Sequence, residues 1–188
     1  MKNILRNRKA LSTVVTTLII LVVSVLLAGV VTYFAINVTS TRVQEESLVL
    51  ASQHIWVDGT GAVQGAIMIT NTGGRDVVIN KLAVRGQTSA WADVLYLMAE
   101  SDDAGLAIDL PHLDATSELI DTGVVPNFAN PLATPTTNLV LPSGDTMVIY
   151  IVAPDSITIN DIGLTVAFTV FTSQAMYYKE TNVNAFVA

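Results

Sequence analysis

The sequence contains no cysteine. Disulfide bridges, thiolate nucleophiles and cysteine-based zinc sites are therefore excluded. The absence of cysteine does not fix the redox compartment, because proteins on either side of a membrane can do without it.

Charge is scarce and unevenly distributed. Only 13% of the residues are charged, and 51% are hydrophobic. Lys2, Arg6, Arg8 and Lys9 supply 4 of the 9 basic residues, whereas all 16 acidic residues lie at or beyond Glu45. A chain without residues 1–10 would hold 5 basic and 16 acidic side chains, a formal charge near −11. Such a surface would repel nucleic acid, so no nucleic-acid partner is expected. It suits a body that stays soluble outside a cell.

One long segment carries much of the hydrophobic excess. Residues 10–41 contain no Asp, Glu, Lys, Arg or His. A helix needs roughly 20 apolar residues to cross a bilayer, so this segment is long enough to span it. Basic residues before the segment and none directly after it predict that the N-terminus lies inside. The apolar stretch is too long for a simple secretory signal peptide.

Small and hydroxyl side chains recur along this segment at spacings of four and seven residues. Such a face lets helices approach closely in an apolar environment. A lone membrane anchor and a helix that packs against other helices are both consistent with the pattern. The candidate packing face consists of Thr13, Thr17, Ser24, Ala28 and Thr32.

Helical spacing of apolar residues continues past the apolar segment to about residue 51, and no Pro or Gly interrupts residues 30–52. We therefore expect one helix over residues 11–53. Its length would be roughly 64 Å, about twice the thickness of a bilayer core. The outer half of such a helix must pack on something other than lipid, which indicates a subunit rather than an anchor.

The N-terminal residues resemble those of a known family. Arg8-Lys9-Ala10, followed by Leu11-Ser12-Thr13-Val14-Val15 and a long apolar helix, is similar to the start of archaeal type IV pilins and archaellins. The resemblance implies that a prepilin peptidase cuts between Ala10 and Leu11. Bacterial type IV pilins have glutamate at the fifth mature position. Here that position is Val15, which fits the archaeal pattern.

The remaining chain is typical of strands separated by turns. We predict strands over residues 62–70, 77–84, 139–141, 146–152, 162–172 and 175–179, with the first two paired as a hairpin and the last two paired with each other. Residues 86–138 hold four prolines and are expected to form a surface excursion, with a helical stretch possible only over residues 91–99. The sequences ITNTGGRDVVINKLAVRG and GLTVAFTVFTSQAMYY resemble the immunoglobulin-like head of archaeal pilins and archaellins. The predicted fold class is α+β, a long N-terminal hydrophobic helix followed by an all-β immunoglobulin-like sandwich.

Catalytic and ligand-binding motifs are sparse. His54 and His112 are far apart in sequence and are expected to be surface histidines. Glu100, Asp102 and Asp103 could bind calcium through oxygen atoms, but a solvated acidic loop is the favoured interpretation. We therefore expect no enzyme activity, cofactor or metal. Asn37-Val38-Thr39 is the sequon for N-glycosylation, and we expect Asn37 to stay unmodified because a packed helix would crowd a glycan.

Together these features predict a filament subunit with three parts. Residues 1–10 form a cleaved basic leader, residues 11–53 a hydrophobic helix and residues 54–188 a β-sandwich head. The precursor would sit in the cytoplasmic membrane, and the mature form would be a helical homopolymer on the cell surface. The resemblance further implies an assembly ATPase and a membrane platform protein as partners. A major pilin for adhesion is the first expectation, and an archaellin of a motility filament is the second. A membrane-tethered immunoglobulin-like binding module is the alternative from another class.

Overall fold

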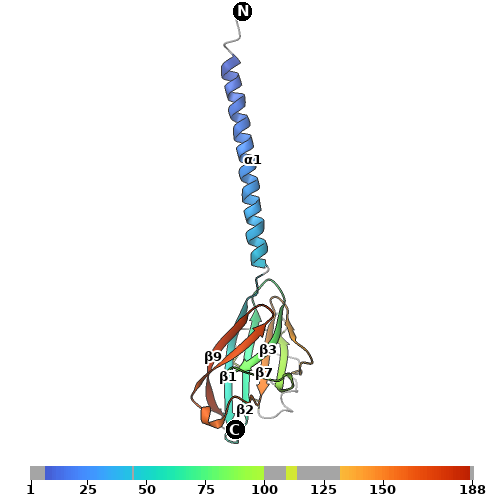
Figure 1. Cartoon of the computed structure of the whole chain (residues 1–188), viewed down its shortest axis with the longest axis vertical. Helices are drawn as coiled ribbons and strands as arrows, with labels where there is room; N and C mark the ends of the chain where they lie inside the picture. The colour runs from blue at the N-terminus through green and yellow to red at the C-terminus, as the bar shows by residue number, and fades with distance from the viewer. Residues whose placement is uncertain (1–6, 44, 100–108, 114–131, 187–188) are drawn as a thin grey trace, which may run out of the picture. The chain divides into compact units, whose positions relative to one another are not determined.

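The computed structural model of the chain describes residues 7–43, 45–99, 109–113 and 132–186. The chain forms two compact units, Met1–Val43 and Gln44–Ala188. The first unit is the helix α1, Asn7–Val43, which Figure 1 shows as one unbroken helix. The second unit, called the β unit below, consists of strands and short 3₁₀ turns.

The strands of the β unit follow one another with short connections at most places (Figure 1). Their order along the chain is β1 Leu48–Asp58, β2 Val63–Asn71, β3 Val77–Val84, β4 Gln87–Thr88, β5 Val94–Ala99, β6 Leu139–Leu141, β7 Thr146–Val152, β8 Thr165–Thr172 and β9 Met176–Phe186. The 3₁₀ turns are η1, Trp91–Asp93, and η3, Ile159–Asp161.

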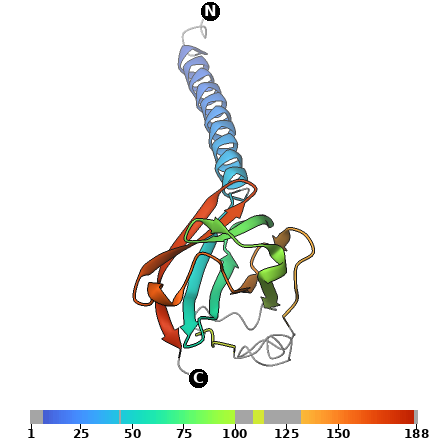
Figure 2. The same cartoon turned by 60° about the horizontal axis from the view of Figure 1, so that its bottom comes forward.

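These strands form a single mixed sheet with the order β4-β3-β8-β9-β1-β2-β7-β5, and β6 also pairs with β3. All the pairings are antiparallel except that of β1 with β9, which are parallel and lie side by side in Figures 1 and 2. We call β1, β2, β5 and β7 the β1 layer, and β3, β4, β6, β8 and β9 the β8 layer.

The sheet curls so that both layers contribute to one hydrophobic core. Ile55, Ile67 and Ile149 come from the β1 layer, Phe168 and Val170 come from the β8 layer, and each is at most 1% exposed. Burying such side chains stabilises a fold by about 1.5–3 kcal/mol each. A curled mixed sheet after a long apolar helix agrees with the predicted α+β class.

The predicted helix end was wrong. Helix α1 ends at Val43, and residues 48–58 form β1 rather than a helical continuation to residue 53. The predicted helix was too long because β1 contains a β-bulge, where its register against β2 shifts between Ala51 and His54. The inward side changes from Leu48 before the bulge to Ile55 and Val57 after it. This break in the two-residue alternation made the strand resemble a helix in sequence.

Backbone hydrogen bonds also hold the start of the β unit in a non-helical conformation. Both Thr72 N–H and Gly73 N–H donate to the carbonyl of Ser47, at 2.9 and 3.1 Å. A Cβ at Gly73 would lie 2.7 Å from the Glu45 carbonyl oxygen and 2.8 Å from Ser47 N. Only glycine allows this close approach. Tertiary contact therefore overrides the local helical pattern here.

Several strand predictions were confirmed and others need correction. Strand β3 has the predicted bounds, and β8 and β9 pair antiparallel as predicted. The predicted hairpin of β2 with β3 was wrong, because β2 pairs with β1 and β7 while β3 pairs with β4, β6 and β8. Residues 72–76 are a crossing between layers, not a hairpin turn.

The structure differs from two further predictions, the start of β8 and the absence of a strand in residues 86–138. Strand β8 begins at Thr165, and the preceding Ile162 and Leu164 are 41% and 47% exposed. Gly163 has a φ of +86°, which interrupts the extended backbone there. Within the predicted surface excursion, residues 94–99 form β5, which pairs with β7 along its whole length. Its alternating Val94, Tyr96 and Met98 contribute to the core.

The crossing between layers is fixed by one buried side chain. Asn71 is fully buried, and its Nδ2 donates to the carbonyls of Arg75, Leu141 and Pro142 at 2.8, 3.1 and 3.1 Å. Its Oδ1 accepts from Gly73 N–H at 3.0 Å. One amide thus holds the β2–β3 crossing against the end of β6.

We predict that Asn71→Asp destabilises the β unit by at least about 3 kcal/mol, because a carboxylate cannot donate to the three facing carbonyls and would itself be buried. Urea unfolding of the detergent-solubilised chain, followed by tryptophan fluorescence, measures the loss. Asn184→Asp makes the same change at an exposed site and should shift the free energy of unfolding by less than about 0.5 kcal/mol. Equal midpoints for the two variants would contradict this role of Asn71.

Candidate functional site

Helix α1 has an apolar surface that its own unit leaves uncovered. Every residue from Leu11 to Thr41 is exposed, and the large apolar side chains range from 46% for Val22 to 68% for Leu11. This stretch is long and apolar enough to cross a membrane. Its 31 residues correspond to about 46 Å of helix, whereas a bilayer core is about 30 Å thick. Part of the apolar surface therefore exceeds what a single bilayer crossing covers.

Six hydroxyl groups of α1 donate to backbone carbonyls within the helix. Thr17 donates to the Val14 carbonyl at 2.9 Å, Ser24 to Ile20 at 2.7 Å and Thr32 to Ala28 at 2.8 Å. The same bonding is made by Thr16, Thr39 and Thr41 to the carbonyls of Ser12, Ala35 and Asn37. A hydroxyl that is already bonded can enter an apolar environment at little cost. The hydroxyl groups thus do not prevent burial of the helix.

The predicted site residues at the N-terminus lie on one continuous helix. Arg8, Lys9 and Ala10 belong to the backbone of α1, so the predicted cleavage position lies within its first turns. The five residues of the predicted packing face, Thr13, Thr17, Ser24, Ala28 and Thr32, are all exposed. Asn37 also lies in α1, and the hydroxyl of Thr39, the third residue of its sequon, donates to the Ala35 carbonyl at 2.8 Å.

The chain that follows α1 is anchored to the β8 layer. Thr172 Oγ1 donates to Glu46 Oε1, and the Tyr177 hydroxyl donates to the Glu46 carbonyl at 3.2 Å. Burial, followed by the charge of Glu46, raises the pKa of Tyr177. On the opposite side, Ser47 Oγ lies 3.0 Å from Thr72 Oγ1. Residues 46–47 are therefore fixed on the β unit only a few residues after α1 ends.

A feature that sequence reasoning missed is the meeting of the two histidines on one tryptophan. His54 stacks on Trp56 with ring centroids 5.0 Å apart, and His112 meets the edge of Trp56 at 5.6 Å. His112 also stacks on Phe186 at 3.8 Å, and His54 Nε2 lies 2.6 Å from Asp109 Oδ1. The alternation His54-Ile55-Trp56 in a strand was the available signal for the first pair, because residues i and i+2 share a face.

These contacts help to hold residues 109–113 against the outer face of the β1 layer. Gln64 Nε2 donates to the Leu113 carbonyl at 3.2 Å, and Leu113 N–H donates to Gln64 Oε1 at 2.9 Å. The Tyr150 hydroxyl donates to the Pro111 carbonyl at 3.0 Å, and burial raises the pKa of Tyr150. Leu110 and Leu113 are thereby buried in a second apolar cluster. The histidines serve packing in this arrangement.

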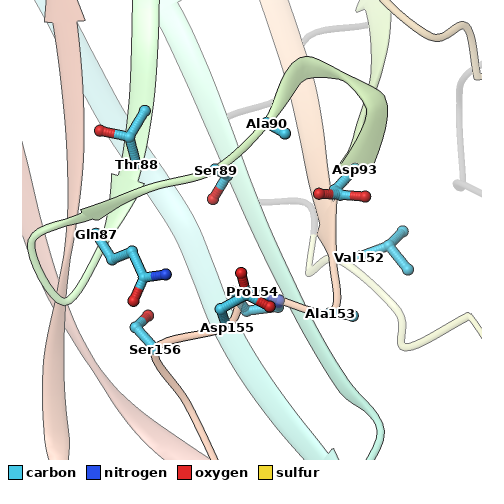
Figure 3. Close-up of a pocket in the computed structure, with 10 residues that line it drawn as sticks. All are labelled: Gln87, Thr88, Ser89, Ala90, Asp93, Val152, Ala153, Pro154, Asp155 and Ser156. Atoms are coloured by element: carbon cyan, nitrogen blue, oxygen red, sulfur yellow. The ribbon is translucent and has the colours of Figure 1, made fainter.

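The described residues offer little for catalysis or metal binding. A hollow of about 100 Å³ lies between residues 87–93 and residues 152–156. Figure 3 shows the carboxylates of Asp93 and Asp155 among its lining side chains. No group of three or more His, Asp or Glu side chains that could hold a metal occurs in the described ranges. The calcium candidates Glu100, Asp102 and Asp103 lie outside them.

Basic side chains of the β unit are confined to the β8 layer and the turns that join it. These four residues are Arg75, Lys81, Arg85 and Lys179. In the described parts of the chain, only Arg85 of these forms an ion pair, with Asp161 at 2.7 Å. Asp161 is buried at 8% exposure, and hydrogen bonds from Thr158 N–H and Oγ1, together with Arg85, lower the pKa of its carboxyl.

The Asp161 contacts predict a specific acid sensitivity. Because the pKa is lower in the folded than in the unfolded chain, the stabilisation is present above the unfolded pKa, about 4, and is lost as pH falls through the folded value. Asp161→Asn should therefore lose less unfolding free energy than the unsubstituted chain as the pH falls below about 4. Denaturant titrations at a series of pH values measure this. Asp155→Asn, at a nearby exposed aspartate, should keep the original slope, and a flattened slope in both variants would contradict the assignment to Asp161.

No protein-family model matches the sequence, and no curated protein is significantly similar to it.

Proposed function

We propose that this chain is the structural subunit of an extracellular filament of the archaeal type IV pilin kind. The observation that carries the proposal is the surface of α1, apolar on every side and bare from Leu11 to Thr41. A helix with this surface is suited to being surrounded, by lipid in a precursor and by identical helices in a bundle. The β unit, which has its own core, would form the exterior as an immunoglobulin-like head.

The internal hydrogen bonds of the helix support bundling. Leaving lipid for a helix bundle gains little hydrophobic free energy, because both environments are apolar. Association must then come from close packing, which small side chains such as Ser24 and Ala28 permit. Their bonded hydroxyl neighbours add no unpaired polar group to the bundle interior. Contacts of this kind repeat without closing when the two contact surfaces differ, which produces a filament.

The basic leader explains how assembly would be controlled. Each Lys or Arg costs about 2.5–3.5 kcal/mol at a bilayer centre even on the most permissive scale. The four basic residues of residues 1–9 would therefore keep an uncut helix at the inner membrane surface. Cleavage between Ala10 and Leu11 by a prepilin peptidase removes them. Because bundling itself releases little free energy, extrusion would depend on an assembly ATPase and a membrane platform protein.

We predict that the mature protein in sheared filaments begins at Leu11, which intact-mass and N-terminal peptide mass spectrometry would measure directly. Replacing Arg8 and Lys9 by Ser should lower the cleaved fraction at least tenfold, since the peptidase must recognise the basic flank. Replacing Lys2 and Arg6 by Ser removes the same charge farther from the cut and should have a smaller effect. A mature chain that retains residues 1–10 would instead support a membrane-tethered binding module.

Helix packing predicts a second outcome. Ala28→Leu adds bulk on the small face and should reduce filament yield at least tenfold while leaving membrane insertion intact. Val30→Phe adds bulk about 160° around the helix and should reduce the yield much less. Quantitative electron microscopy of sheared fractions gives the yield, and blots of membranes give the inserted precursor. Equal yields from the two variants would contradict the proposed face.

The proposed filament serves adhesion as a pilus, with motility as an archaellin the second candidate. The two share the same helix bundle and head, and a swimming assay on a deletion strain separates them. Loss of surface attachment with retained swimming supports the pilus.

A further inference from the structure

The outer face of the β8 layer carries a patch of large apolar side chains, in which Met176 and Tyr178 are exposed and Phe171 is half-buried. Met176 is 59% exposed and Tyr178 is 65% exposed on β9. Phe171 on β8 pairs directly with Met176, and Thr169 pairs with Tyr178, so these side chains share one face. We call Phe171, Met176 and Tyr178, together with Arg75 and Lys81 described next, the β8 patch.

Two cations border this apolar group. Lys81 on β3 pairs with Phe171, and its ammonium lies 4.9 Å from the centre of the Phe171 ring. Arg75 reaches the β8–β9 turn, where its guanidinium lies 2.7 Å from the side-chain amide of Gln174. Neither cation forms an ion pair with a carboxylate of the described residues. Glu180 lies two residues after Tyr178 on the same face of β9, opposite Ala167, so it is the acidic neighbour of the patch on this strand.

The opposite layer has the complementary character. Strands β1, β2, β5 and β7 contain no Lys or Arg, and neither do residues 109–113, 132–138 or the connecting turns at 59–62, 89–93, 142–145 and 153–157. The same stretches contain Asp58, Asp93, Asp109, Asp145 and Asp155. The side chain of Asp109 is 87% exposed. One molecule therefore presents a cationic apolar patch on one layer and an acidic surface without cations on the other.

The two outer faces also differ in their cover. On the β1 layer, Met68, Val148 and Tyr150 are fully buried beneath Leu110, Leu113 and Leu132. The outer face of the β8 layer has no such apolar cover from the described segments. An apolar group of this kind, rimmed by charge, is the usual character of an interaction surface.

We propose that the β8 patch binds the acidic β1 layer of a second copy of this chain, so that neighbouring heads contact each other along the filament. The two surfaces are different parts of the molecule, and a contact between different surfaces propagates instead of closing into a dimer. Opposite charge fixes which surface meets which, and the apolar side chains are removed from water at the centre of the contact. This inference rests on the proposed filament function.

The absence of native cysteine allows a direct test in whole filaments. Tyr178→Cys places a thiol in the patch. Asn160→Cys places one in η3, at an exposed position outside both proposed contact surfaces. Labelling by a maleimide is compared between native filaments and the same filaments dispersed in detergent. We expect at least tenfold protection of Tyr178→Cys in filaments and no more than twofold protection of Asn160→Cys.

Charge reversal supplies an independent arm. Lys81→Glu should reduce filament yield at least fivefold and should remove the protection of Tyr178→Cys in the filaments that remain. Lys179→Glu makes the same change of net charge, but it pairs with the core residue Phe168 and lies on the other side of β9. It should leave both readouts within twofold of those of the parent chain.

The following results would overturn the proposed contact between the β8 patch and the β1 layer. Filaments in which Tyr178→Cys is labelled as fast as in detergent, or in which both thiols are equally protected, overturn the contact and leave the filament function intact. Protection of dispersed Tyr178→Cys by anionic lipid vesicles, without protection in filaments, assigns the patch to a membrane and overturns it as well. A parent chain that retains its leader and forms no filaments overturns the proposed function, and the inference with it.

Discussion

A helix whose apolar surface its own unit leaves uncovered is the constraint on which the rest of this molecule depends. Residues 11–41 hold no charge and receive no cover from the first unit. The β unit has a core of its own, built from two layers of one curled sheet. The internally bonded hydroxyls of α1 allow the helix to be surrounded by lipid or by protein without burying unpaired polar groups.

Sequence periodicity predicted the elements whose side chains alternate without interruption. Residues 77–84 form β3 with the predicted bounds, and residues 146–152 form β7. Periodicity failed at β1, where the bulge near Ser52 reverses the inward side, and at the end of α1, where the Ser47 carbonyl is taken by Thr72 and Gly73. Strand pairing was predicted correctly only for β8 with β9. The predicted pairing of β2 with β3 failed because the partner of β2 is selected by burial and by the long-range contacts of Asn71 rather than by the nearest turn.

The features of the candidate site likewise fall into two groups, those visible in consecutive residues and those that only the fold brings together. The lack of charge in α1 and the basic residues before it are properties of consecutive residues, so the sequence alone displays them. The β8 patch is different, because Arg75, Lys81 and Phe171 are brought together only by the pairing of β3 with β8 and by the turn after β8. The meeting of His54 and His112 at Trp56 likewise depends on residues 109–113 folding over the β1 layer. Contacts between distant segments were beyond what spacing could reveal.

The position of β1 has a mechanical consequence. The chain leaves α1 and enters the sheet within five residues, and it enters at an interior strand, flanked by β2 on one side and β9 on the other. A tensile load transmitted along α1 and directed along β1 would act on both ladders in shear, so many hydrogen bonds must break together instead of one after another. An edge strand under the same load could peel away from a single neighbour. The β unit is thus joined to α1 through a strand that resists being pulled out of the sheet.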